Sequence, residues 1–176
     1  MDYLKTLDAS INHPKYRGAK IPTLEEVFDF MTGNDLKLNI ELKEEHESNR
    51  KFIEKVAELE KEFSFQDRVM YCSFNHYTLM NLKKLLPHTK VGLLYHAGII
   101  EPWHYAKKIG ADCIHPSWKF GMMNQGIKEA HKLGLEVNLW TVDDEKDMRT
   151  LFAEGVDGII TNKPDLAAWV REGMKK

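Results

Sequence analysis

Apolar and polar residues alternate along residues 36–43. The apolar positions are Leu36, Leu38, Ile40 and Leu42, and the polar positions between them are Lys37, Asn39, Glu41 and Lys43. A period of two predicts a β-strand with one apolar and one polar face. By itself this pattern is equally typical of a half-exposed antiparallel strand.

The order of the following elements favours a parallel sheet. Helical periods alternate with short apolar strands to the end of the chain, which is the arrangement of β/α units. Strands are predicted at residues 36–43, 68–74, 90–95, 112–115, 135–142 and 156–161, and helices at 47–63, 77–86, 102–109, 122–133, 144–154 and 164–172. Because strands in such a sheet are usually covered on both faces, the polar face ending in Glu41 and Lys43 is expected to line a site.

The N-terminal part is simpler. Residues 1–20 contain Pro14 and many polar residues, and we interpret them as a connecting segment with at most a short helix at residues 2–7. A helix is predicted to begin after Thr23, which can cap its free amides, with Glu25 and Glu26 in the first turn. We therefore expect one domain over residues 1–176, in which residues 21–176 hold this helix and six β/α units.

Two architectures suit a series of β/α units, the doubly wound sheet and the closed barrel. The strands here are not followed by a glycine-rich phosphate-binding turn, which doubly wound folds usually carry. Polar or small residues recur instead where strands end, as barrel active sites require: Glu41, Lys43, Ser73, His115, Trp140 and Asn162. The prediction is an α/β fold of the (β/α)8 TIM-barrel type, incomplete, because such a barrel needs eight strands and about 250 residues.

Composition narrows the function classes. The chain has 176 residues, 43% of them hydrophobic, which is ordinary for one globular domain, and a net charge of -2 that argues against a nucleic-acid partner. Lys175 and Lys176 are interpreted as a solvated end. Cys72 and Cys113 are expected to be buried free thiols in a reducing compartment, and no signal peptide or membrane-spanning stretch is visible, so a cytoplasmic location is predicted.

Five segments together resemble the glycerophosphodiester phosphodiesterase family. They are Ile-Pro-Thr-Leu-Glu-Glu-Val at 21–27, Asn-Ile-Glu-Leu-Lys at 39–43, Cys-Ser-Phe at 72–74, Leu-Trp-Thr-Val at 139–142 and Gly-Val-Asp-Gly-Ile-Ile-Thr-Asn-Lys-Pro at 155–164. They occur in family order, and the resemblance runs from residue 21 almost to the end. It implies a (β/α)8 barrel fold and a divalent metal cofactor. The implied reaction is hydrolysis of glycerophosphodiesters to an alcohol and glycerol 3-phosphate.

The resemblance also implies roles for individual residues. Glu41 and Lys43 match the family's Glu-x-Lys motif on strand three, which makes Glu41 a ligand of Mg²⁺ or Ca²⁺ and Lys43 a phosphate contact. Trp140 matches the strand-seven tryptophan. The family's His-Arg-Gly motif, the glutamate after it, its Glu-x-Asp pair and its second histidine are not found here, so the first two strands are expected to be missing.

Each of these residues also has a structural interpretation. Glu41 and Lys43 could form an ion pair at a strand end, and Trp140 could be a core residue rather than a wall for the glycerol or alcohol group. Ser73 and His115 are candidate substrate contacts, although packing is favoured for Ser73 and a loop hydrogen bond for His115. The other histidines, His46 among them, show no metal-ligand spacing.

We expect this chain alone to have negligible diesterase activity, because one carboxylate is a poor site for a hard cation that takes six or more oxygens. The alternative is a non-catalytic fragment or phosphate-binding module that assembles with another chain. Six strands leave two unpaired sheet edges, which could pair with a second copy or with a separate N-terminal piece.

Overall fold

The computed structural model describes residues 2–43, 49–65, 67–120 and 125–174. The predicted helix starts at Glu47 and Met122, together with His46, Lys175 and Lys176, lie outside the described residues. The other predicted elements can be compared with the structure directly.

Six parallel strands form one sheet in sequence order. They are β1 (Leu38–Glu41), β2 (Val69–Ser73), β3 (Lys90–Tyr95), β4 (Cys113–Pro116), β5 (Glu136–Trp140) and β6 (Gly158–Ile160). Each strand pairs with the next, from Leu38 opposite Val69 at one end to Trp140 opposite Ile160 at the other. Within the described residues, β1 and β6 therefore have a neighbour on one side only.

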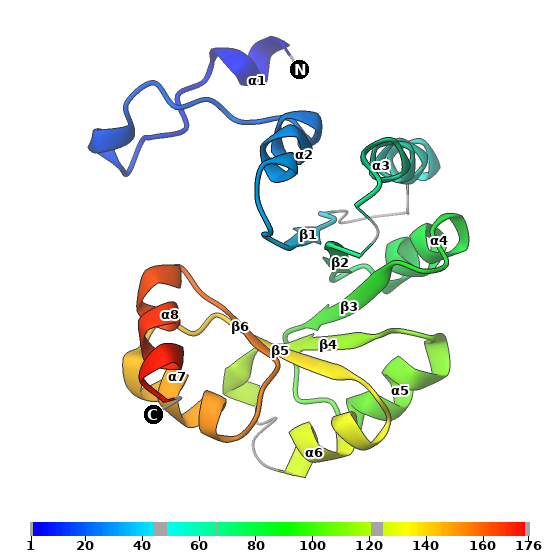
Figure 1. Cartoon of the computed structure of the whole chain (residues 1–176). Helices are drawn as coiled ribbons and strands as arrows, with labels where there is room; N and C mark the ends of the chain where they lie inside the picture. The colour runs from blue at the N-terminus through cyan, green and yellow to red at the C-terminus, as the bar shows by residue number, and fades with distance from the viewer. Residues whose placement is uncertain (1, 44–48, 66, 121–124, 175–176) are drawn as a thin grey trace.

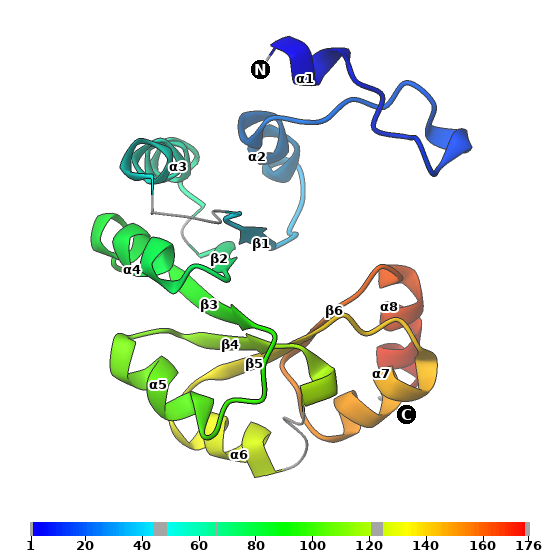
Figure 2. The same ribbon diagram turned by 180° about the vertical axis from the view of Figure 1, so that it is seen from behind.

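Helices surround the outer side of the curled sheet, as Figures 1 and 2 show from opposite sides. They are α3 (Arg50–Phe63), α4 (His76–Leu85), α5 (Pro102–Ile109), α6 (Gln125–Lys132), α7 (Glu145–Ala153) and α8 (Pro164–Gly173), while α1 (Asp2–Thr6) and α2 (Leu24–Thr32) precede β1. This is the right-handed β/α arrangement of a barrel that curls without closing. The expectation of an incomplete TIM-barrel-type fold is confirmed.

Local chemistry explains several boundaries. The Thr23 side chain accepts a hydrogen bond from the Glu26 amide, and the Glu26 carboxylate accepts one from the Thr23 amide, so a complete capping box starts α2. The predicted ranges of β3 and α5 are confirmed at both ends. Gly110 ends α5 at a φ of 82°, a left-handed conformation that glycine adopts at little cost.

Other boundaries differ from prediction. The first strand begins at Leu38 rather than Leu36, and Leu36 is 57% exposed, at an edge that no other described strand covers. The strand expected at 112–115 is Cys113–Pro116, and the 3-10 turns at Pro14–Tyr16 and Trp118–Phe120 were not predicted.

β5 and β6 end earlier than predicted, and a carboxylate takes over where their ladder ends. Asp143 accepts hydrogen bonds from the Thr161 hydroxyl and from the amide and side chain of Asn162. These bonds, those of Asn162 foremost, lower the pKa of Asp143. Asn162, expected among the polar strand-end residues, thus has a structural role.

The core lies between the sheet and its helices. The largest fully buried side chains come from both layers and include Tyr71, Leu93 and Ile114 on strands and Ile53 and Leu79 on helices. β4 is buried along its whole length, whereas every residue of β6 is only half-buried. Among the described helices none is long and apolar enough to cross a membrane.

Candidate functional site

The candidate site lies at the carboxyl ends of the first two strands. Glu41 ends β1, and the Lys43 ammonium lies 3.7 Å from its carboxylate. The side chain of Glu41 is 36% exposed and that of Lys43 is 77% exposed. Both line a concave pocket of about 750 Å³ that also contacts Ser73, Phe74 and Tyr105. The spacing of two thus brings the two charges together, and both lie at a pocket.

Ser73 borders the same pocket, but its hydroxyl is already engaged. It donates a 2.6 Å hydrogen bond to the carbonyl of Leu42 and accepts one from the amide of Asn75. Ser73 is 1% exposed. This hydrogen bond links the end of β2 to the residue after β1, at the wall of the pocket.

His115 lies deeper, on β4, and is fully buried. Its Nε2 is 3.0 Å from the side-chain amide nitrogen of Asn138, and its Nδ1 has no hydrogen-bond partner among the described residues. Burial lowers the pKa of His115 to about 4, so the ring is neutral at pH 7. It lies over Gly92, where even a methyl group would come within 2.5 Å of the imidazole. His115 does not line the Glu41 pocket.

Trp140 connects these two regions. Its indole nitrogen donates a 2.6 Å hydrogen bond to the carbonyl of His115. Its ring meets Phe74 edge to face at 5.5 Å and lies 5.7 Å from the ring of His96. Since Phe74 lines the Glu41 pocket, Trp140 forms an aromatic wall beside it.

The sequence analysis did not identify two residues of this pocket, His76 and Tyr105. The Nε2 of His76 lies 3.0 Å from the carbonyl of Leu94, and its Nδ1 lies 3.0 Å from the hydroxyl of Tyr105. Since a carbonyl only accepts, Nε2 carries the proton, and in the neutral ring Nδ1 accepts from Tyr105. Burial, helped by nearby Tyr77, raises the pKa of Tyr105. The only sequence signal for His76 was its place just after a strand end.

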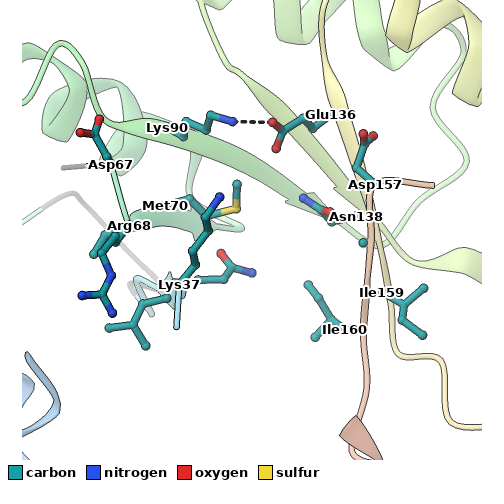
Figure 3. A pocket seen from close by; sticks show the side chains of 14 residues that line it. Lys37, Asp67, Arg68, Met70, Lys90, Glu136, Asn138, Asp157, Ile159 and Ile160 are labelled. Carbon is teal, nitrogen blue, oxygen red and sulfur yellow. Dashed lines mark hydrogen bonds and ion pairs between the residues drawn. The ribbon is translucent and has the colours of Figure 1, made fainter. Parts of the chain in front are cut away.

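A second cavity, of about 480 Å³, lies toward the amino ends of the strands (Figure 3). Residues of both edge strands line it, and an ion pair joins Lys90 to Glu136 on its wall. In barrels this end supports stability, whereas the carboxyl ends of the strands carry active sites.

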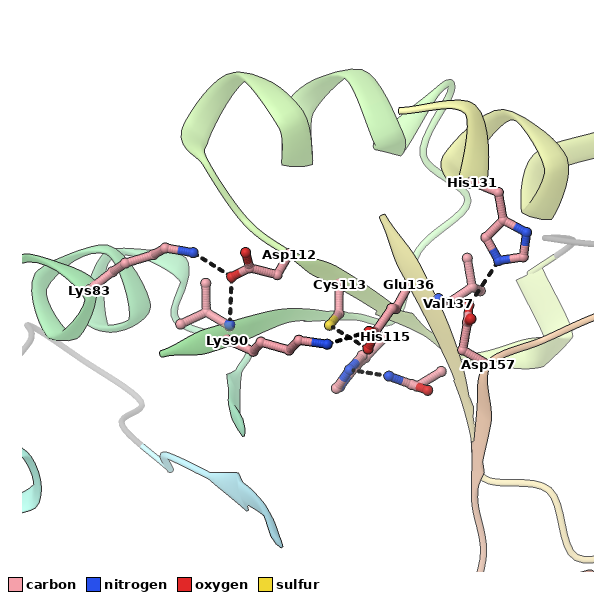
Figure 4. Close-up of polar contacts among 11 residues, drawn as sticks. Lys83, Lys90, Asp112, Cys113, His115, His131, Glu136, Val137 and Asp157 are labelled. Carbon is pink, nitrogen blue, oxygen red and sulfur yellow. Dashed lines mark hydrogen bonds and ion pairs between the residues drawn. The ribbon is translucent and has the colours of Figure 1, made fainter. Parts of the chain in front are cut away.

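Two aspartates hold the amino ends of the strands (Figure 4). Asp112 pairs with Lys83 and accepts from the amide of Val91, and Asp157 pairs with His131 and accepts from the amide of Val137. Asp112 lies just before β4 and holds the start of β3. Asp157 lies just before β6 and holds the start of β5. This repeat is structural.

The described residues do not form a metal site by themselves. No group of three or more His, Cys, Asp or Glu side chains that could hold an ion occurs among them. Glu41 offers two carboxylate oxygens beside the Lys43 cation, whereas a hard divalent cation takes six or more oxygens. The residues present therefore do not fit a complete magnesium or calcium site.

A family model described as the glycerophosphoryl diester phosphodiesterase family matches residues 1–166. The chain belongs to this family. A glycerophosphodiester phosphodiesterase of Caldanaerobacter subterraneus is 41% identical over 98% of the chain and 72% of that protein. One of Bacillus altitudinis is 37% identical over 98% of the chain and 71% of its own length.

Solved structures of the family share the fold. A putative glycerophosphoryl diester phosphodiesterase of Silicibacter pomeroyi superposes with a TM-score of 0.88 at 21% identity, covering 99% of this chain and 68% of that one. An Oleispira antarctica phosphodiesterase, solved with its product sn-glycerol-3-phosphate, superposes with a TM-score of 0.79 at 22% identity, covering 99% and 70%. The family is generally dependent on a divalent metal.

Proposed function

We propose that this chain carries the phosphate-facing part of a metal-dependent glycerophosphodiester phosphodiesterase site. The reaction is hydrolysis of a glycerophosphodiester to an alcohol and glycerol 3-phosphate. The observation that carries the proposal is the pairing of Glu41 with Lys43 at a pocket on the carboxyl ends of the strands. Family membership and the names of the relatives support the same substrate class.

The two charged groups would divide the work. Glu41 would be one ligand of Mg²⁺ or Ca²⁺, a metal that supplies charge at the phosphate when bound, and Lys43 would contact the non-bridging phosphate oxygens. In the described structure the two side chains neutralise each other at 3.7 Å. An arriving phosphate would draw Lys43 toward its own oxygens and leave the Glu41 carboxylate open to another cation.

The remaining candidates would shape the substrate site. We propose that Trp140 packs against the glycerol or alcohol group, since its ring is held from two sides next to Phe74. Ser73 and His115, proposed as substrate contacts from the sequence, would act mainly by positioning, because Ser73 donates within the protein and His115 is buried away from the pocket.

We further propose that the chain alone has negligible diesterase activity. Only Glu41 among the described residues offers a carboxylate to a metal at the pocket. The other candidate function is that of a non-catalytic phosphate-binding module that assembles with itself or another chain through its sheet edges. Within the described residues, the single carboxylate at the pocket and the sheet edges at β1 and β6 are the observations that support this alternative.

A titration with glycerol 3-phosphate followed by NMR tests the phosphate role. We expect signals at β1 and the start of α4 to shift, with at least a tenfold weaker response in Lys43→Met. Lys132→Met is the matched control, because Lys132 also pairs with a glutamate on the surface but lies far along the chain on α6. Equal binding by both variants would contradict the assignment of Lys43.

An activity assay separates the two functions. Glycerophosphocholine incubated with the chain and Mg²⁺ or Ca²⁺ should release no glycerol 3-phosphate above background. Robust metal-dependent release that Glu41→Gln abolishes would show that the chain is an enzyme by itself.

The unpaired state of Cys72 and Cys113, both buried, supports the further proposal of a reducing, cytoplasmic compartment.

A further inference from the structure

The pocket at Glu41 combines charged and aromatic groups that come from different elements. Its charged side chains, Glu41 and Lys43, lie at the end of β1. Its aromatic rings lie elsewhere: Phe74 follows β2, Tyr77 is in the first turn of α4, and Tyr105 is on α5. Lys43 is the only Lys or Arg side chain among the described residues that line this pocket. A diester held by its phosphate at Lys43 would therefore extend one of its two arms along the rings.

These three rings are accessible to a ligand. The exposed fraction is 53% for Phe74, 82% for Tyr77 and 43% for Tyr105. Single exposed aromatic residues are common on protein surfaces, whereas three on the wall of one pocket of about 750 Å³ are suited to contact a small molecule. The face of an aromatic ring carries partial negative charge and attracts an ammonium group. The rings thus favour a positively charged arm.

The hydroxyl of Tyr105 has a defined direction of hydrogen bonding. The Nε2 atom of His76 lies 3.0 Å from the carbonyl of Leu94, and because a carbonyl only accepts, this nitrogen carries the ring proton. In the neutral imidazole the other nitrogen, Nδ1, then accepts from the Tyr105 hydroxyl, which lies 3.0 Å away. Since the hydroxyl has one proton and donates it to His76, its oxygen can only accept a hydrogen bond from a ligand.

The same contact holds the ring of Tyr105 in place. The rings of His76 and Tyr105 lie 5.6 Å apart with an angle of 33° between their planes, and both residues line the pocket. Through its bond to the Leu94 carbonyl, His76 is in turn fixed to β3. An acceptor held at a pocket wall discriminates against a ligand that lacks the matching donor, because the acceptor is then left without its partner.

We propose that Tyr105, positioned by His76, is a specificity-determining residue that selects diesters whose alcohol carries an ammonium group with N–H donors. This inference rests on the proposed function, since it takes the phosphate to lie at Lys43. The rings of Phe74 and Tyr77 attract the positive charge, and the Tyr105 oxygen accepts one N–H. An ethanolamine arm satisfies both contacts. A choline arm keeps the charge but has no N–H to donate.

Isothermal titration calorimetry with the whole chain tests this selection. The three ligands are glycerophosphoethanolamine, glycerophosphocholine and glycerol 3-phosphate. We expect the ethanolamine diester to bind at least about fivefold more tightly than the choline diester, a factor for one charge-assisted hydrogen bond at a partly exposed group. In Tyr105→Phe this preference should fall to within about twofold. Equal affinity of the unmodified chain for the two diesters would overturn the proposal.

Variants at neighbouring positions separate recognition from packing. Tyr77→Phe removes a hydroxyl from the same pocket and keeps the ring, so the preference for the ethanolamine diester should remain. His76→Leu removes the Nδ1 acceptor and should lower the preference although Tyr105 is unchanged. His76→Asn places an acceptor oxygen near the position of Nδ1 and should restore part of it. An equal loss of preference in Tyr77→Phe and Tyr105→Phe, or full preference in a folded His76→Leu, would contradict these roles.

The ligand without an alcohol arm separates this inference from the proposed function. Lys43→Met should weaken the binding of all three ligands and leave the preference between the two diesters in place. Glycerol 3-phosphate bound through Lys43, without a preference between the diesters, would overturn the inference alone. A preference combined with affinities that Lys43→Met leaves unchanged would support the Tyr105 subsite and count against the phosphate role. Weaker binding of glycerol 3-phosphate by Tyr105→Phe would assign the subsite to the glycerol and overturn the ammonium assignment.

Discussion

The indole of Trp140 is bound to the backbone of His115 by a hydrogen bond of 2.6 Å from Nε1 to the carbonyl oxygen. This bond joins the ends of β5 and β4 at the mouth of the sheet. It also fixes the plane of the Trp140 ring, against which Phe74 packs edge to face. A phenyl ring at this position would keep part of the packing and lose the link.

Trp140→Phe should therefore destabilise the fold by about 1 kcal/mol, the usual net contribution of one hydrogen bond, with a further cost for the smaller ring. Urea unfolding followed by circular dichroism measures this change. Trp169→Phe is the control, because Trp169 is 58% exposed on α8 and should alter stability by less than about 0.5 kcal/mol. Equal effects of the two changes would contradict a structural role for the Trp140 bond.

His115 should make the fold sensitive to acid. Its pKa is lowered to about 4 in the folded chain, whereas an unfolded histidine titrates near 6.5. The fold favours the neutral ring, so the contribution of His115 to the free energy of unfolding is complete above pH 6.5 and is lost as the pH falls through 4. The difference corresponds to roughly 3 kcal/mol. His115→Gln should flatten this part of the stability profile, while His13→Gln, at an exposed position, should leave it unchanged.

Gly92 makes room for that same ring. A Cβ atom at this position would approach His115 to 2.5 Å, and both residues are surrounded by packed strands. We expect Gly92→Ala to lower the free energy of unfolding by about 1–3 kcal/mol through overpacking. Gly98→Ala meets nothing within 4 Å and serves as the control in the same urea experiment. A neutral Gly92→Ala would show that the imidazole is free to move.

Glu60 is a carboxyl group buried on the inner side of α3, beside the hydroxyls of Tyr71 and Thr89. Burial raises its pKa, which favours the protonated form in the fold. The stability that the protonated Glu60 contributes is complete below the pKa of an unfolded glutamate, and it is lost as the pH rises through the raised pKa of the folded chain. Relative to the unmodified chain, Glu60→Gln should therefore be more stable at pH 8 than at pH 4, by about 1 kcal/mol in the free energy of unfolding.

The surface residue Glu58 provides the comparison for Glu60. It lies on the same helix, exposed and paired with Lys55 at 4.0 Å. Glu58→Gln should show the same pH profile as the unmodified chain when both are unfolded by urea at several pH values. A Glu60→Gln variant that loses stability at pH 8 would mean that the ionised carboxylate is favoured in the fold.

The best-predicted elements are those whose limits are local. α5 begins at Pro102 and ends before Gly110, and neither limit depends on what packs nearby. The Thr23–Glu26 capping box is likewise contained within four successive residues. The range of β1 was predicted less well, because an edge strand is ordered only where β2 pairs with it.

The candidate site shows the same division. The sequence alone determined that Glu41 and Lys43 share a strand face, because side chains in a strand repeat every two residues. It also determined the order of β/α units and the family. The contact between His76 and Tyr105, the burial of His115 over Gly92 and the bond from Trp140 to the His115 carbonyl were decided only by the tertiary structure. Each of these contacts joins residues more than twenty positions apart, whose distance depends on how neighbouring strands are aligned and how helices pack across them, which no local pattern encodes.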